Sequence, residues 1–222
     1  MSDVAANLKV VRERIAAACD RSGRPPREVT LVGISKTHDA SDVAEAYRAG
    51  LRDFGENRIQ EAAAKIITLR ARGVTPRWHL VGHLQRNKAR AALDLFDILH
   101  TVASEQLGRA LDLPAERPVK VLVEVNVAGE ETKHGVSVSA APALVELLRG
   151  LPNIDVAGLM TVAPQADDPE DVRGVFRELR KLRDTLGLRD LSMGMTGDFE
   201  VAIEEGSTLV RVGRAIFGAR AP

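Results

Sequence analysis

The sequence predicts one α/β domain over residues 1–222, a (β/α)8 barrel of the TIM type with an extra N-terminal helix. Eight short aliphatic and β-branched runs alternate with amphipathic helical stretches, at roughly regular intervals and without a linker. A length of 222 residues also fits one such barrel. An open doubly wound sheet is the alternative, but no Gly-x-Gly-x-x-Gly follows the first strand, which weakens a dinucleotide-binding interpretation.

The order of the elements follows from apolar periodicity and from helix start and stop residues. Val4, Leu8 and Val11 have helical spacing and predict a helix over 1–23, ahead of a barrel over 29–218. The strands are predicted over 29–36, 53–57, 77–82, 97–102, 119–126, 154–162, 191–196 and 209–212. Helix starts are predicted at Ser41, Ser104, Asp168–Pro169 and Asp198.

Composition argues against several classes of partner. Lys+Arg and Asp+Glu both total 31, so no global positive field attracts nucleic acid or an anionic membrane. Aromatic residues make up 3%, too few for base-stacking platforms, and no apolar run approaches the roughly 20 residues that span a bilayer. The single cysteine, Cys19, and the lack of a signal-peptide core predict a cytoplasmic location. No metal-ligand spacing is present.

Polar side chains stand near the predicted carboxyl ends of several strands, which share one rim in a barrel. These residues are Lys36, Asn57, His79, His83, Asn126, Thr161, Thr196 and Arg211. Lys36 is either a solvated lysine beyond a strand or an amine that leaves a low-dielectric lumen. In the second case desolvation lowers its pKa, and the neutral amine can attack a carbonyl.

Two glycine-containing turns, after the seventh and eighth strands, are candidates for binding a phosphate. Thr196 offers a hydroxyl there, and Gly213–Arg214 offers backbone N–H groups and a cation. The alternative is a pair of ordinary tight turns. Together with an amine at the first strand, a phosphate site suggests a phosphorylated aldehyde, and pyridoxal 5'-phosphate (PLP) fits that description.

Three further side chains have two interpretations each. Arg211 either meets the pyridine nitrogen of PLP, which keeps that nitrogen unprotonated and weakens the ring as an electron sink, or pairs with a rim carboxylate. Asn57 either bonds the phenolate oxygen or caps the helix at Arg58. His79 is a hydrogen-bonded lumen residue in preference to a catalytic base.

Over nearly its whole length the chain resembles the pyridoxal phosphate homeostasis protein family. The stretches that carry the resemblance are 32–37 (VGISKT), 54–57 (FGEN), 78–82 (WHLVG), 84–88 (LQRNK), 158–161 (GLMT), 191–196 (LSMGMT) and 210–213 (VRVG). Their order and spacing together are far more specific than any one of them.

The resemblance implies a barrel like the N-terminal domain of alanine racemase, with PLP held as a Schiff base on Lys36. It implies phosphate contacts from Thr196, Gly213 and residue 214, and Arg211 at the ring nitrogen. Met160 and Ser192, which lie in the matching stretches, complete the expected cofactor-binding residues. Position 214 departs from the family, which usually has a small hydroxyl residue there. The Arg214 guanidinium either adds charge to the phosphate or turns outward, so that the phosphate has one hydroxyl donor fewer.

Family members buffer and deliver the cofactor and balance vitamin B6 and amino-acid pools, without an established turnover. The resemblance therefore implies a monomeric carrier and regulator, with PLP and PLP-dependent apoenzymes as partners and no catalytic residue. A racemase-like enzyme is the alternative, but it needs a second base that the related racemases take from another domain, and this chain ends at residue 222. A Schiff-base aldolase acting through Lys36 without a cofactor is a third hypothesis.

Overall fold

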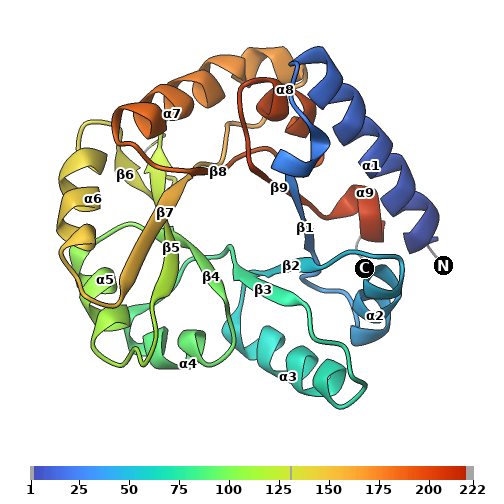
Figure 1. Ribbon diagram of the computed structural model, residues 1–222, viewed down its shortest axis with the longest axis horizontal. Coiled ribbons are helices and arrows are strands. Elements are labelled where there is room, and N and C mark those ends of the chain that lie inside the picture. Colours follow the sequence, from blue (N-terminus) through green and yellow to red (C-terminus); the bar gives the residue numbers. More distant parts are fainter. Residues whose placement is uncertain (1–2, 131, 219–222) are drawn as a thin grey trace.

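Eight parallel strands close into a barrel, which confirms the predicted fold (Figure 1). The computed structural model describes residues 3–130 and 132–218. The barrel strands are β1 (Thr30–Ile34), β2 (Asp53–Glu56), β3 (Arg77–Leu80), β4 (Ile98–Val102), β5 (Val119–Asn126), β7 (Ile154–Met160), β8 (Asp190–Ser192) and β9 (Leu209–Val212). Closure is complete because β1 pairs with both β2 and β9, while β4 pairs with β5.

Helices surround the strands and cover their outer face (Figure 1). In the described ranges they are α1 (Val4–Arg21), α2 (Ala40–Arg48), α3 (Ile59–Arg70), α4 (Ala89–Leu93), α5 (Glu105–Asp112), α6 (Ala141–Arg149), α7 (Arg173–Thr185), α8 (Phe199–Glu204) and α9 (Arg214–Phe217). Short 3-10 turns span Pro26–Glu28, Arg86–Lys88 and Pro169–Val172. The extra helix α1 buries Val4, Leu8 and Val11 and contacts α8 and α9, as its apolar spacing predicts. Within the described ranges, no helix is long and apolar enough to cross a bilayer.

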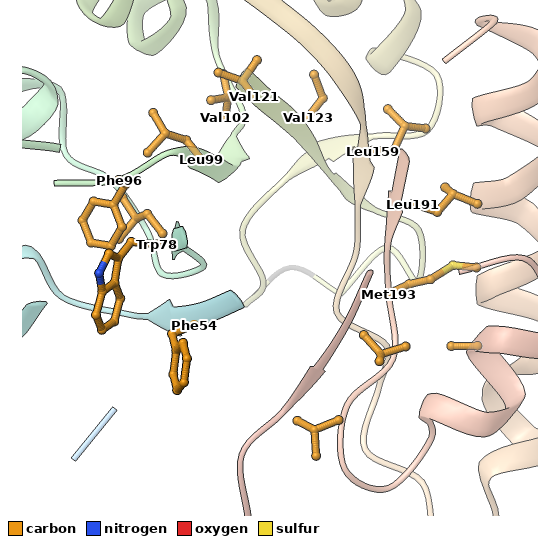
Figure 2. Close-up of a cluster of buried hydrophobic side chains, with 14 of the residues drawn as sticks. Phe54, Trp78, Phe96, Leu99, Val102, Val121, Val123, Leu159, Leu191 and Met193 are labelled. Atoms are coloured by element: carbon orange, nitrogen blue, oxygen red, sulfur yellow. The ribbon is translucent and has the colours of Figure 1, made fainter. Parts of the chain in front are cut away.

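The main hydrophobic core lies between the strands and the helices. Figure 2 shows side chains of this layer, among them Phe54, Trp78, Val121 and Leu159, which are all at most 3% exposed. Alternate residues of the same strands line the lumen instead. That interior holds a small apolar cluster of Leu122, Ala157 and Met160, and several buried polar side chains lie beside it. The inner face of this barrel therefore combines apolar and buried polar side chains.

The structure corrects several predicted boundaries. The seventh barrel strand, predicted to reach 196, ends at Ser192, because Gly194 has a φ of +94° and turns the chain out of the sheet. The strand predicted over 154–162 ends at Met160. Ser41 does not cap α2, whose N-cap is Asp39, whereas Ser104 caps α5 by accepting from the N–H of Leu107 at 3.2 Å.

One short strand was not predicted. β6 (Val136–Ser137) pairs with β5 but lies outside the closed barrel. It follows the polar segment 129–135. The side chain of Asn126, at the end of β5, donates to the carbonyl of Glu130 in that segment at 2.8 Å. Two residues are too few to give a periodic signal, which is why the sequence does not predict this strand.

Candidate functional site

A cavity of about 470 Å³, which we call the upper cavity, opens at the carboxyl ends of the barrel strands. It brings together five of the residues predicted for the site, which are Lys36, Thr196, Arg211, Gly213 and Arg214. Its wall also includes one cationic and several apolar residues that the sequence did not single out, namely Lys133, Val162, Ala163, Pro164 and Met195. An amine, a buried guanidinium and the two glycine-containing turns therefore share one pocket, of a size typical for small-ligand sites.

Lys36 lies in a tightly held turn immediately after β1 and is half-buried. Its neighbour Thr37 has a φ of +68°, and no other non-glycine residue in the described ranges has a positive φ. This conformation costs a threonine on the order of 1–2 kcal/mol, so surrounding contacts must maintain it. Glu61 provides one such contact, because its carboxylate accepts a hydrogen bond from the Thr37 N–H.

A buried ion pair holds the other side of the same turn. Lys65, from α3, donates to the carboxylate of Glu56 at 2.5 Å and to the carbonyl of Ser35 at 2.7 Å. The Ser35 hydroxyl also donates to Glu56 at 2.7 Å. Burial raises the pKa of Glu56, and the bonds from Lys65 and Ser35 oppose that rise. Side chains of α3 thus anchor the backbone on both sides of Lys36, and Glu56 of β2 holds Ser35 through its hydroxyl.

Arg211 projects from β9 into the lumen and is only 5% exposed. Its Nη1 donates to the hydroxyl of Ser192 at 2.6 Å and its Nη2 to the carbonyl of Thr161 at 2.9 Å. Burial lowers the pKa of Arg211 to about 10, against the attraction of Asp198 and Glu124, so the group remains a cation at neutral pH. The ion-pair interpretation is wrong, since no carboxylate of the described residues lies within 4 Å of this guanidinium.

His79 is fully buried and hydrogen-bonded, as the lumen interpretation predicts. Its Nε2 lies 3.0 Å from Asp53 Oδ1, and its Nδ1 lies 2.8 Å from Nε2 of His100. It does not line the upper cavity. His83, in contrast, is exposed, and its ring stacks on that of His134 with centroids 4.5 Å apart.

Three predicted site residues do not line the upper cavity. Met160 and Ser192 are buried in the lumen, on neighbouring positions of β7 and β8. Asn57 is half-buried just after β2, and the capping interpretation is wrong because Arg58 is the N-cap of α3, without a side-chain cap bond. Arg214 is exposed at the cavity edge. Cofactor contacts of these residues, and of the five that line the cavity, remain predictions.

The described residues include no group of three or more His, Cys, Asp or Glu side chains arranged to hold a metal ion. Apart from the Asp198 carboxylate, the cavity wall combines N–H, hydroxyl and cationic donors, a set suited to an anionic ligand.

Comparison with known proteins places the chain in a family. Residues 4–221 match the family model described as "Alanine racemase, N-terminal domain". The chain is 43% identical to the pyridoxal phosphate homeostasis protein of Aquifex aeolicus, with 96% of each chain covered. It is 41% identical to the protein of that name from Escherichia coli K12, over 99% of this chain and 98% of the relative. The chain belongs to the pyridoxal phosphate homeostasis protein family.

Solved structures agree with this membership. PipY of Synechococcus elongatus, a structure with PLP bound, is 38% identical and superposes with a TM-score of 0.82 over 94% of this chain and all of that one. An uncharacterised protein of Bifidobacterium adolescentis gives a TM-score of 0.91 at 37% identity, with 98% and 97% of the two chains covered. Alanine racemase of Clostridium difficile shares the fold alone, at 16% identity and a TM-score of 0.74, and this chain covers 58% of it.

Proposed function

We propose that this chain binds PLP at the upper cavity and serves intracellular PLP homeostasis, as a reversible carrier of the cofactor. The observation that carries the proposal is the placement of the Lys36 amine, the two glycine-containing turns and the buried Arg211 around one pocket. The names of the relatives and the PLP-bound state of PipY support the same ligand.

The donors present fit the three reactive parts of PLP, which supplies an aldehyde, a phosphate and a ring nitrogen. Lys36 provides the amine that condenses with the aldehyde, with release of one water, so the bond can be hydrolysed again. Thr196 and the Gly213–Arg214 backbone provide hydroxyl and N–H donors for the phosphate. Arg211 serves the ring nitrogen, because a guanidinium donates hydrogen bonds and cannot accept them.

The charge of Arg211 favours a carrier over an enzyme. A permanent donor at the ring nitrogen keeps that nitrogen unprotonated, and the ring is then a weaker sink for electrons from a bound amino acid. The relatives are named as homeostasis proteins, which supports the same direction. We include in the proposal a monomeric, cytoplasmic protein that passes PLP to apoenzymes. Equal totals of 31 basic and 31 acidic residues give it no global positive field that would attract nucleic acid or membrane.

Absorbance of the purified protein tests the proposal. Wild type incubated with PLP is expected to develop a visible band that Lys36→Ala lacks, while Lys9→Ala, a change at an exposed lysine of α1, retains it. An undiminished band in Lys36→Ala would assign the amine to another lysine. Hydrogen–deuterium exchange at the α-carbon of added amino acids, followed over many turnovers, is expected to stay at the level of free PLP. Sustained exchange that requires the protein would establish an enzyme instead.

A further inference from the structure

A row of buried side chains crosses the lumen beneath the upper cavity. Arg211 Nη1 donates to Ser192 Oγ at 2.6 Å, and Ser192 Oγ lies 2.9 Å from Nδ1 of His100. The other ring nitrogen of His100 lies 2.8 Å from Nδ1 of His79, whose Nε2 lies 3.0 Å from Asp53 Oδ1. The five residues come from five strands, and none of them is more than 5% exposed.

The row joins the two ends of the barrel. Arg211 lines the upper cavity, whereas Asp53 and its ion-pair partner Arg77 line a separate cavity of about 410 Å³ near the amino ends of the strands. Arg77 Nε lies 2.8 Å from the Asp53 carboxylate. Burial opposes ionisation of Asp53, but the bonds from His79 and Arg77 outweigh it and lower the pKa of this carboxyl. The row therefore has a fixed cation at one end and a fixed anion at the other.

These two ends define the direction of the hydrogen bonds. Arg211 can only donate, so Ser192 accepts from it and can direct its own hydroxyl proton to Nδ1 of His100. His100 then carries its proton on Nε2 and donates to Nδ1 of His79. His79 likewise carries its proton on Nε2 and donates to the Asp53 carboxylate. Every bond of the row is satisfied with both imidazoles neutral, and the aligned dipoles stabilise both end charges.

The opposite direction is less favourable. His79 would have to be a cation, or Asp53 protonated, for His79 to donate to His100 and still bond to Asp53. His100 would then donate to the Ser192 hydroxyl, which already accepts from Arg211, and the Ser192 proton would have no acceptor within the row. The titratable groups that act on His100 are His79 from β3, Arg211 from β9 and Lys120 from β5. Burial, followed by these three, lowers the pKa of His100 well below its ordinary value.

We propose a positioning role for four residues, Ser192, His100, His79 and Asp53. Their hydrogen bonds form a one-directional row that holds the Arg211 guanidinium in place as a donor to the ligand in the upper cavity. The ligand part of this inference rests on the proposed function, but the direction of the row does not. A second anchor for Arg211 is the carbonyl of Thr161, so disruption of the row shifts the guanidinium without releasing it.

Nitrogen-15 NMR of histidine-labelled protein without PLP tests the row itself. At neutral pH, His79 and His100 are both expected as neutral Nε2–H tautomers, and the exposed His83 and His134 provide comparison signals in the same spectrum. Loss of single signals in His79→Gln and His100→Gln provides the assignment. A cationic His79, or an Nδ1–H tautomer at His100, would overturn the proposed direction.

The ligand-bound protein tests the positioning role. His79→Gln and His100→Gln are expected to retain the absorbance band and borohydride capture of PLP at Lys36, but to shift the pH midpoint of the spectrum by about one unit. His83→Gln, at a histidine outside the row, is expected to leave the midpoint unchanged. Unshifted midpoints in both row variants would refute the positioning role. Absence of the band in wild type would instead refute the proposed function, with the tautomer result unaffected.

Discussion

The buried Glu56–Lys65 pair beneath the Lys36 turn permits a quantitative prediction. Lys65→Met keeps a long apolar side chain but removes the only cation bonded to Glu56 among the described residues. Side chains of the pair are 0% and 5% exposed, so water does not replace the missing partner. Breaking such a pair costs about 3–5 kcal/mol, a large share of the roughly 5–15 kcal/mol that stabilises a typical domain.

The sign of the pH dependence follows from Glu56. Without Lys65, burial dominates and raises the pKa of Glu56 further above that of the unfolded chain. The unfolded chain releases the Glu56 proton above about pH 4.3, whereas the folded variant keeps it until the pH reaches the higher folded-state pKa. The free energy of unfolding of the variant therefore falls as the pH rises across this interval. The deficit relative to wild type is therefore expected to be larger at about pH 8 than at about pH 5.

Urea unfolding at the two pH values measures this deficit. The double variant Glu56→Gln/Lys65→Met removes both charges, and the new amide oxygen at position 56 can still accept from Ser35, so this variant is expected to recover most of the stability. Lys9→Met, at a lysine side chain that is 78% exposed, is expected to change stability by less than about 0.5 kcal/mol. A destabilisation under about 1 kcal/mol in Lys65→Met, or an equal destabilisation in the double variant, would refute this reasoning.

Two other substitutions test the site and the barrel. Arg211→Glu places an acceptor where the donor lies, so protonation of the PLP ring nitrogen is favoured. The absorption spectrum or the reactivity toward amino acids is therefore expected to change. An unaltered spectrum and reactivity would refute the contact between Arg211 and the ring nitrogen. Gly158→Ala puts a Cβ 1.9 Å from the backbone oxygen of Asp190 in the adjacent strand, and thermal unfolding should reveal a destabilisation of about 1–3 kcal/mol. Gly174→Ala, in α7 with no atom within 4 Å of the new Cβ, should instead be neutral or stabilising, and equal effects at both glycines would contradict the clash.

The sequence predicts the fold well because each barrel strand is buried on both faces and each helix has one apolar face. It also predicts the residues of the upper cavity that stand at strand ends, such as Lys36 and Thr196, since parallel strands place those ends on one rim. Lys133 and the apolar wall at 162–164 were missed, because they lie in loops whose path has no periodic signal.

The polar interior was largely hidden from sequence reasoning. His100 sits in the run Ile98–Val102, which has the pattern of an ordinary buried strand, and its partners come from β3 and β8. Which lumen residues face one another depends on the stagger of the closed barrel, and no local pattern encodes that. Lys65 had a usable signal, because it falls on the same helical face as Ala62 and Leu69, where a charged residue requires a buried partner.

The central claim is that the Lys36 amine holds PLP reversibly in the upper cavity. Borohydride reduction of the PLP-loaded protein, followed by peptide mass mapping, tests it most directly. We predict one phosphopyridoxyl adduct on the peptide that contains Lys36, and no such adduct when excess hydroxylamine removes PLP before reduction. An adduct spread over surface lysines, with the Lys36 peptide unmodified, would contradict the account.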